Sequence, residues 1–201
     1  METNNKRNAL NARDLITIGI LAAISLVIFM VTGIIAGVTI VGTIYNIPIT
    51  SFFVSIAYML LVARVRKPGT FFIMGTINSI PGLMAANIFG VVASIIGWGI
   101  ADLISSLNNY RNKKILVLSY VAGATLHAAF FTFPMFASGG QYILKRQEAF
   151  HLTDAVIAQY IKFLSWPIYS SIIALTAVAS LVGAIISIRI LKKHFEKAGL
   201  L

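Results

Sequence analysis

Long apolar runs, separated by short polar and basic stretches, make up most of the chain. A bilayer core about 30 Å thick is crossed by about 20 consecutive apolar residues in a helix. Six segments reach or approach that length, at residues 15–36, 47–63, 70–86, 88–107, 115–137 and 163–190. The pattern therefore predicts an all-α, polytopic membrane protein, in which six transmembrane helices form one integral membrane domain over residues 1–201.

The first apolar segment is expected to be a retained helix rather than a cleaved signal peptide. Its apolar run is longer than the h-region of a signal peptide, and no small-residue cleavage site follows it. Asn11, with Asp14 three residues later, is typical of a helix N-cap followed by an early acidic residue.

The basic residues give the predicted helices a direction. Of the 16 lysines and arginines, all but Lys145, Arg146 and Lys162 fall on one face of a six-helix bundle. Lysine and arginine in short loops mark the cytoplasmic side, so both termini are predicted to be cytoplasmic. Residues 1–14 and 191–201 are then cytoplasmic segments, and residues 138–162 form a long extracellular loop. An odd number of helices would break this alternation of charge.

The composition supports a membrane location and excludes several classes of function. The chain is 58% hydrophobic and 11% charged, with a mean hydropathy of +0.89, whereas soluble domains carry about 25% charged residues. A net charge of +10 would suggest nucleic acid in a soluble protein. These basic clusters are the kind that orient membrane helices, so no nucleic-acid partner is expected.

Several kinds of reactive group are missing from the sequence. The absence of cysteine excludes disulfides, thiolate metal sites and cysteine nucleophiles. There is no HExxH, no GxSG, no pair of glutamates and no GxxxxGK[ST] phosphate-binding loop. The chain is therefore expected not to be an enzyme and to hold no metal or cofactor, and any ATP hydrolysis would belong to partner subunits.

Polar and aromatic residues gather where the extracellular half of the bundle is predicted. Aromatic rings with a few convergent amides are what a concave small-molecule site needs, although an interfacial aromatic belt would give a similar pattern. The long loop is expected to contain an amphipathic helix that starts at Thr153 or Asp154 and runs into the last span with a kink at Pro167. The predicted ligand-binding residues are Tyr45, Asn46, Asn87, His127, Phe130, Phe131, Gln141, Tyr142, Trp166 and Tyr169.

His127 lies near the middle of the fifth apolar segment, and three interpretations of it stay open. Polar residues at this depth face the interior of a bundle. The imidazole could be hydrogen-bonded to a neighbouring helix, form the floor of an extracellular cavity, or act as an axial ligand to a metal or a tetrapyrrole. No second ligand is evident in the sequence for the last of these.

Asp102 lies near the cytoplasmic end of the fourth apolar segment. The C-terminus of a helix is a poor place for an anion. We therefore predict that Asp102 forms a structural ion pair with a cytoplasmic arginine or lysine, with a role in coupling as the alternative.

Small residues mark where helices approach closely. Membrane helices pack mainly through such residues, because lipid provides little hydrophobic drive for helix association. The stripes of small residues in the third, fourth and sixth segments are interpreted as internal packing. The patch of Gly19, Ala22 and Ala23 in the first segment could equally dock a separate membrane subunit.

Two stretches carry a resemblance to a known family. NARDLITIGILAAISLVIFMVTGIIAG at residues 11–37 and GWGIADLISS at residues 97–106, together with the six-helix plan, resemble the substrate-binding S components of energy-coupling factor (ECF) transporters. Within that group the chain is most similar to the Trep_Strep integral-membrane family. Many S components carry Ala-x-x-x-Ala in the first helix for docking, and here the nearest equivalent is Gly19-x-x-x-Ala23.

The resemblance implies a mechanism and a set of partners. An S component in the cell membrane binds a vitamin or similar micronutrient outside, beneath the first outer loop and between the last three helices. It then docks on a transmembrane coupling subunit that carries two ATPases, and it tilts to release the ligand inside. A flat aromatic or carboxylated ligand is expected, because the predicted pocket holds no acid and Lys145, Arg146 and Lys162 lie at its rim.

Other functions stay open from the sequence alone. A stand-alone small-molecule channel or facilitator is the main alternative. An accessory protein for membrane assembly and an intramembrane enzyme without a recognisable motif are the others.

Overall fold

A computed structural model describes residues 9–84, 86–147 and 151–193 of the chain, and this part is helical and contains no strand. The all-α class predicted from the sequence is confirmed. In chain order the helices are α2 (Ala12–Gly37), α3 (Ile40–Ile44), α4 (Asn46–Arg64), α5 (Thr70–Ser79), α6 (Pro81–Met84), α7 (Ile88–Ser106), α8 (Lys113–Ala137), α9 (Gln141–Leu144), α10 (Asp154–Phe163) and α11 (Trp166–Leu191).

Five of these helices are long and apolar enough to cross a membrane: α2, α4, α7, α8 and α11. The third predicted span is shorter and is divided into α5 and α6, which together cover Thr70–Met84. Pro81 begins α6, where a residue without a backbone N–H is tolerated. Multiple membrane passes are thus confirmed, whereas the count of six and the side on which the termini lie stay predictions.

The outside of the bundle is largely apolar, and several hydroxyl groups lie inside it. Ile16, Ile34, Val92 and Val178 are among the many aliphatic side chains that are more than half exposed, whereas polar side chains such as Thr176 and Ser180 are fully enclosed. Hydroxyl groups placed inward can bond a carbonyl or one another, which lipid cannot offer them. This distribution is that of a protein surrounded by lipid.

The caps explain where several helices begin. The Oδ1 of Asn11 accepts from the backbone N of Asp14 at 2.9 Å, and the Asp14 carboxylate accepts from the backbone N of Asn11 at 2.9 Å. The predicted cap at Asn11 is therefore confirmed as a capping box. Thr153 caps α10 by accepting from the backbone N of Val156 at 3.4 Å. The amphipathic helix of the long loop thus begins at the predicted place.

The prediction of a continuous helix kinked at Pro167 is wrong. Helix α10 ends at Phe163, and α11 begins at Trp166 after a short break. Pro167 lies in the first turn of α11, where its missing N–H would have no helical partner in any case. The last span therefore begins at Trp166 rather than at residue 163. The predicted segments 1–14 and 191–201 lie largely outside the described residues.

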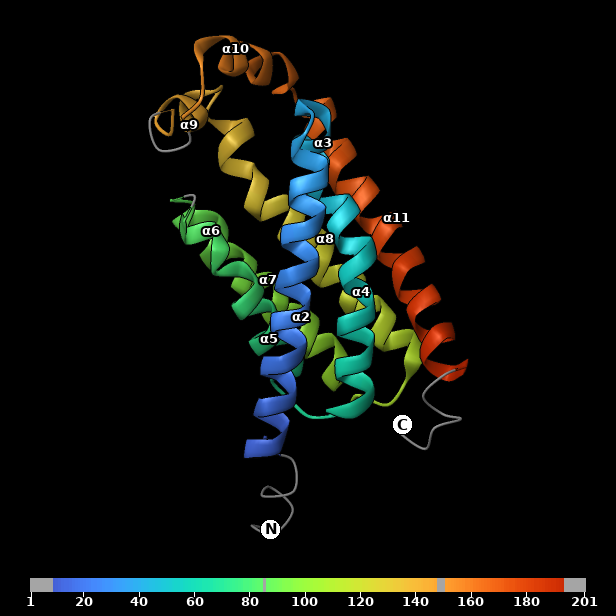
Figure 1. The fold of residues 1–201 in the computed structure, drawn as a ribbon. Coiled ribbons are helices and arrows are strands. Elements are labelled where there is room, and N and C mark those ends of the chain that lie inside the picture. The colour runs from blue at the N-terminus through green and yellow to red at the C-terminus, as the bar shows by residue number, and fades with distance from the viewer. Residues whose placement is uncertain (1–8, 85, 148–150, 194–201) are drawn as a thin grey trace.

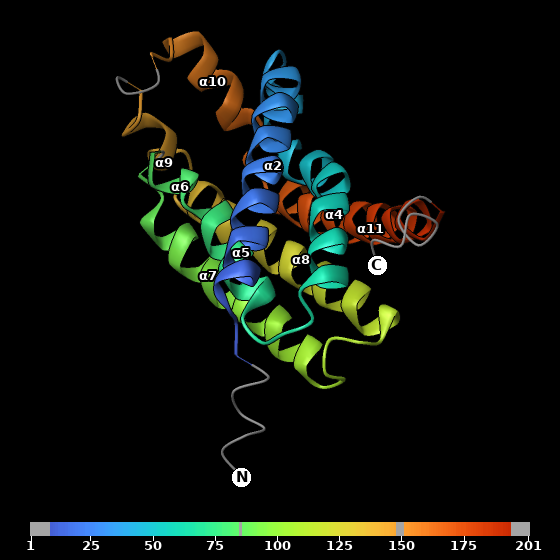
Figure 2. The ribbon, with the colours of Figure 1, turned by 60° about the horizontal axis from the view of Figure 1, so that its bottom comes forward.

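The membrane helices form a closed ring. Helix α2 packs on α4, α4 on α11, α11 on α8, α8 on α7, α7 on α5, and α5 returns to α2. A further contact between α4 and α8 crosses the ring and divides it, with α11 on one side and α2, α5 and α7 on the other. The beginning of α2, the end of α11 and the basic loops lie at one end of the bundle, and α3, α6, α9 and α10 lie at the other (Figures 1 and 2).

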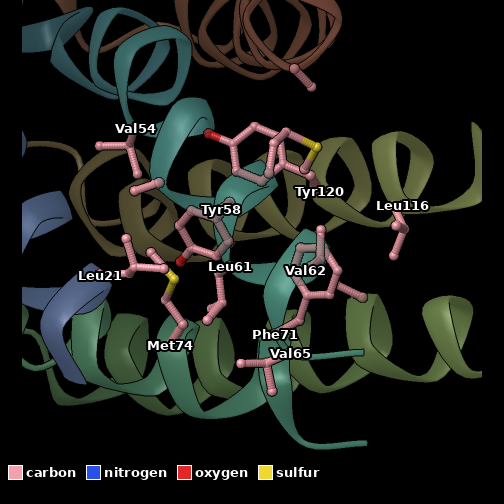
Figure 3. Packing of buried hydrophobic residues seen from close by; sticks show 14 of the residues in the cluster. Leu21, Val54, Tyr58, Leu61, Val62, Val65, Phe71, Met74, Leu116 and Tyr120 are labelled. Atoms are coloured by element: carbon pink, nitrogen blue, oxygen red, sulfur yellow. The ribbon is translucent and has the colours of Figure 1, made fainter. Parts of the chain in front are cut away.

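The ring is tightest around Trp98, a residue of α7. Its indole lies where a side chain on Gly75 of α5 or on Gly123 of α8 would stand, so both positions require glycine. On the facing helices, Tyr58 and Tyr120 complete the aromatic core, and Figure 3 shows their rings beside each other with Leu21 and Met74 close to Tyr58. Three helices therefore meet around one large side chain.

The Asp102 carboxylate joins three segments at the end of the bundle that holds the basic loops. Its Oδ2 accepts from the backbone N of Gly69 at 2.8 Å and from the Tyr110 hydroxyl at 2.8 Å. Its Oδ1 accepts from the backbone N of Phe71 at 2.9 Å. Asp102 thus supplies an acceptor for the first N–H groups of α5. Burial and then the neighbouring Asp102 carboxylate raise the pKa of Tyr110 well above its usual range, so the phenol stays a donor.

This arrangement corrects the prediction that Asp102 forms an ion pair. Within the described residues its partners are two N–H groups and a phenol, and the salt bridge that forms there joins Lys67 to Asp14 at 2.7 Å. The C-terminus of α7 is an unfavourable position for the Asp102 carboxylate. The N-terminus of α5 compensates for this, because a negative charge is favourable there.

Substituting Gly183 with alanine should destabilise the bundle. A Cβ at this position would lie 2.5 Å from the Phe52 carbonyl oxygen, which is backbone of α4 and cannot rotate away. Overpacking of this kind costs about 1–3 kcal/mol, and thermal unfolding of the detergent-solubilised protein by circular dichroism measures it. Gly19→Ala is the control, because nothing lies within 4 Å of its added Cβ. An equal melting temperature for the two variants would contradict the α4–α11 contact.

Removing the Asp102 carboxylate should destabilise the protein by leaving buried donors without partners. Each buried donor left unsatisfied costs about 1–3 kcal/mol, so Asp102→Ala should lower the melting temperature strongly. Asp154→Ala is the comparison, because the Asp154 carboxylate accepts from the exposed Gln147 amide and should matter little. If the two variants melt alike, Asp102 does not hold the start of α5.

Candidate ligand-binding site

A cavity of about 240 Å³ lies inside the ring, among α2, α4, α5, α6, α7 and α8. On α4 and α8 its lining residues recur at intervals of three, four or seven, which places each set on one helical face. The residues that line it are Ser25, Leu26, Phe29, Ile47, Thr50, Ser51, Val54, Tyr58, Asn78, Pro81, Gly82, Trp98, Tyr120, Ala124, His127 and Phe131.

The cavity lies toward the end of the bundle remote from the basic loops. It is lined by the first two thirds of α4, by the junction of α5 and α6, and by the middle of α8 from Tyr120 to Phe131. These parts point toward the end of the bundle that carries α3, α6, α9 and α10 (Figure 1). Small-molecule sites usually measure about 300–1,000 Å³, so this cavity suits a small ligand.

Aromatic rings form one wall and the floor of the cavity. The rings of Tyr58 and Trp98 are stacked, with centroids 4.7 Å apart and planes 15° from parallel. Tyr120 lies 5.0 Å from Tyr58, and the imidazole of His127 stacks on Phe131 at 5.1 Å. The Tyr120 hydroxyl donates to the Ser51 carbonyl, which fixes its ring. The wall therefore consists of two stacked pairs, with Tyr120 held at an angle of 44° to Tyr58.

A short polar chain crosses the cavity wall from α2 to α4. The Ser25 hydroxyl lies 2.7 Å from Asn78 Oδ1, to which it can donate, and Asn78 Nδ2 donates to the Tyr58 hydroxyl at 3.0 Å. Three helices thus place polar groups at one level of the bundle. These groups are the means by which a mostly apolar cavity could fix the orientation of a ligand.

Two further polar atoms in the lining residues are enclosed without a hydrogen-bond partner in the described part of the chain. They are Nε1 of Trp98 and Nδ1 of His127. Leaving a buried polar atom unpaired costs about 1–3 kcal/mol. Both residues line the same cavity, and a ligand there would have to reach these enclosed nitrogens to satisfy them.

Of the ten ligand-binding residues predicted from sequence, the structure brings His127 and Phe131 into the lining. Asn87 lies directly behind them. Its Oδ1 caps α7 by accepting from the backbone N of Gly90 at 3.0 Å, and its Nδ2 donates to the Phe131 carbonyl at 2.8 Å. Asn87 therefore positions the cavity wall rather than forming it. Phe130 is half-buried and does not belong to the lining.

The residues predicted near the first outer loop and the start of the last span lie elsewhere. The Asn46 amide oxygen accepts from Thr50, which does line the cavity, at 3.0 Å. The Tyr45 hydroxyl pairs with Ser171 at 2.8 Å, and the Tyr169 hydroxyl donates to the Ala129 carbonyl at 3.0 Å. Both tyrosines belong to a second apolar cluster that ties α3 and α8 to α11.

The remaining predicted residues lie on the surface of the same end. Trp166 is 56% exposed and packs edge-on against Tyr169 at the start of α11, as expected of an interfacial aromatic residue. Gln141 is exposed at the start of α9. The Tyr142 ring lies 3.5 Å beneath the Arg146 guanidinium, whose Nη2 donates to the Ala86 carbonyl at 2.6 Å. These groups tie the α9 segment to the turn after α6.

Sequence reasoning missed the residues that make up most of the site. Tyr58, Asn78, Trp98 and Tyr120 all lie within apolar runs and were not selected. Tyr120 and His127 are seven residues apart, as are Ser51 and Tyr58. A search for polar and aromatic residues at that spacing within the runs would have found both faces.

The cavity does not lie between the last three spans, where the resemblance places the ligand. Helix α11 contributes no lining residue, because the α4–α8 contact separates it from the cavity.

The patch of small residues in α2 is divided between two faces. Ala22 is 1% exposed and belongs to the core. Gly19 and Ala23, four residues apart, are exposed, and nothing lies within 4 Å of a Cβ added to Gly19. Of the three residues in the patch, Gly19 and Ala23 are the two that another membrane subunit could contact. The predicted docking role therefore does not extend to Ala22 in this arrangement.

A family model described as a hypothetical bacterial integral membrane protein (Trep_Strep) matches residues 12–197. The chain belongs to the Trep_Strep family. The match begins with the first residue of α2 and continues beyond α11, so the complete ring is a feature of the matched region. No curated protein and no solved structure matches the chain.

Membership of the Trep_Strep family confirms the resemblance noted in the sequence at the level of the family. It establishes an integral membrane protein and agrees with the several apolar helices of the structure. In this Trep_Strep protein, the cavity is the structural feature that indicates a more specific function.

The two tryptophans should report very different environments. Trp98 is 4% exposed and Trp166 is 56% exposed. In the Trp166→Phe protein, the remaining emission from Trp98 should be resistant to quenching by iodide. In the Trp98→Phe protein, the emission from Trp166 should be quenched several-fold more strongly. Equal quenching constants would show that Trp98 does not lie in an enclosed cavity.

Proposed function

We propose that this chain is the substrate-binding S component of an ECF-type importer in the bacterial cell membrane. It captures a small micronutrient from outside in the cavity between α2, α4, α5–α6, α7 and α8. It then docks on a coupling subunit that is driven by two ATPases. The observation that carries the proposal is the cavity, which lies toward the end of the bundle opposite the basic loops and has a closed aromatic floor.

The floor supports a binding protein over a channel. Below the cavity, Tyr58, Phe71 and Met74 are each at most 1% exposed and fill the ring together with Leu61 and Val62. A channel needs a continuous polar path or a constriction that can open along its axis. The described residues instead place a packed apolar core between the cavity and the basic end of the bundle. A solute that enters such a cavity needs a larger rearrangement to leave on the other side.

The exposed face of α2 supports docking on a partner. Gly19 and Ala23 form a shallow strip among larger exposed side chains such as Ile16 and Ile20. Small residues at a spacing of four allow the backbone of a second helix to approach closely, and this is a common way for membrane helices to associate. The absence of a phosphate-binding loop from the sequence agrees with an external source of energy.

Enlarging this strip should separate docking from ligand capture. Gly19→Leu and Ala23→Leu should each reduce co-purification of the coupling subunit and its ATPases by at least about tenfold, since close approach is lost. The ligand that native mass spectrometry detects on the protein from its own host should still be present, because neither residue lines the cavity.

Ala174→Leu is the matched control, since Ala174 is an exposed small residue of α11 on a different face. It should leave the complex intact. If Gly19→Leu and Ala23→Leu both retain the coupling subunit at the level of this control, the proposed docking face is refuted. If no coupling subunit co-purifies with the unmodified protein, the proposed function itself fails.

A further inference from the structure

The lining of the cavity restricts the charge of its ligand. Among the sixteen lining residues there is no aspartate, glutamate, lysine or arginine. The nearest basic groups at the same end, such as Arg146, are engaged at the turn after α6 and do not line the cavity. Enclosing an ion without a counter-charge costs far more than enclosing a neutral group. A neutral ligand is therefore favoured over an anion or a cation.

The hydrogen-bonding groups of the lining restrict the ligand further. The Tyr58 hydroxyl accepts a hydrogen bond from Asn78 Nδ2 and donates none to a described residue. One proton of Asn78 Nδ2 is used in that bond, which leaves the other. Trp98 Nε1, which can only donate, has no partner among the described residues. Three uncommitted donors thus lie at this level, and a ligand that offers acceptors would satisfy them.

The shape of the cavity points to a flat ligand. Trp98 and Tyr58 present nearly parallel rings, and His127 and Phe131 form a second stacked pair on α8. Aromatic faces pack best against another planar ring in an offset stack. A volume of about 240 Å³ accommodates one or two fused rings rather than a large macrocycle.

We propose that the cavity binds an uncharged, planar heterocycle whose edge carries hydrogen-bond acceptors, such as a ring carbonyl or an unprotonated ring nitrogen. Trp98, Asn78 and Tyr58 donate to that edge, and the stacked rings of His127 and Phe131 cover one face of the ligand. This inference rests on the proposed function in that it takes the cavity to be the ligand site.

The test is binding of probes that share a ring and differ in charge. Nicotinamide is neutral, nicotinate is its carboxylate analogue, and 1-methylnicotinamide is its cationic analogue. Uracil and orotate form a second neutral and anionic pair. Isothermal titration calorimetry on the purified full-length protein should show saturable binding of a neutral member, at least about tenfold tighter than its charged analogues. A charged member that binds as tightly as its neutral partner overturns the proposal, and so does the absence of binding by both neutral rings.

Two variants test the donors for the neutral probe that binds. Trp98→Phe and Tyr58→Phe each remove one polar atom and keep an aromatic ring, and each should weaken binding by roughly tenfold, since about 1.4 kcal/mol corresponds to a factor of ten. Tyr58→Phe decides the question if Trp98→Phe does not fold. Thr125→Val is the matched control. The Thr125 hydroxyl on α8 is also enclosed and unpartnered in the described part of the chain, but Thr125 does not line the cavity. Unchanged affinity in Tyr58→Phe and in any folded Trp98→Phe protein would overturn the assignment of the donors.

Failure of this inference and failure of the proposed function give different results. A protein that captures the coupling subunit but prefers charged probes keeps the proposed function and loses the ligand class. A protein that binds the neutral rings and captures no coupling subunit keeps the ligand class and loses the role in an importer.

Discussion

The close approach of α5, α7 and α8 around Trp98 is the constraint on which the rest of the structure depends. Lipid gives apolar side chains little reason to prefer another helix, so the helices must gain their contacts through shape. Gly75 and Gly123 leave room on two helices for one indole from a third. Tyr58 then stacks on that indole. Both rings therefore belong to the packed core and also line the cavity.

The ring of helices is divided by the contact between α4 and α8, and the two parts have different characters. On the side of α11, Gly183 allows the backbones of α4 and α11 to approach closely, and Ser55 and Ser187 pair at 2.9 Å. On the side of α2 and α5, polar and aromatic groups leave a space between them. The first part is closely packed throughout, whereas the second combines the main aromatic core with the candidate site.

The helices could be predicted from sequence because their lengths are set by the bilayer and their starts by local caps. Asn11 and Thr153 act within three residues of themselves, so their roles are visible in the sequence. The break before Trp166 was missed because Pro167 is compatible with either a kink or a helix start, and only the surrounding backbone decides between them. The partners of Asp102 were missed for a similar reason. The N-terminus of α5 comes beside it only through the packing of α5 on α7.

Most of the candidate site could not be predicted, because its position depends on which helices are neighbours. The residues chosen from sequence were those at the ends of apolar runs, where polarity stands out. The lining instead draws on single residues within the runs, such as Asn78, which meets Ser25 and Tyr58 only in the folded ring. His127 was identified because its polarity is conspicuous at mid-membrane depth.

Helix α5 and the short α6 are secured by one charged group at each extremity. The Asp102 carboxylate accepts hydrogen bonds from the first N–H groups of α5. The Arg146 guanidinium donates to the carbonyl of Ala86, just beyond α6. Pro81 and Gly82 of the cavity lining lie between these two attachments. Loss of the Arg146 contact alone would leave this stretch attached through Asp102, so the segment that follows α9 could change the position of Pro81 and Gly82 without detaching the start of α5.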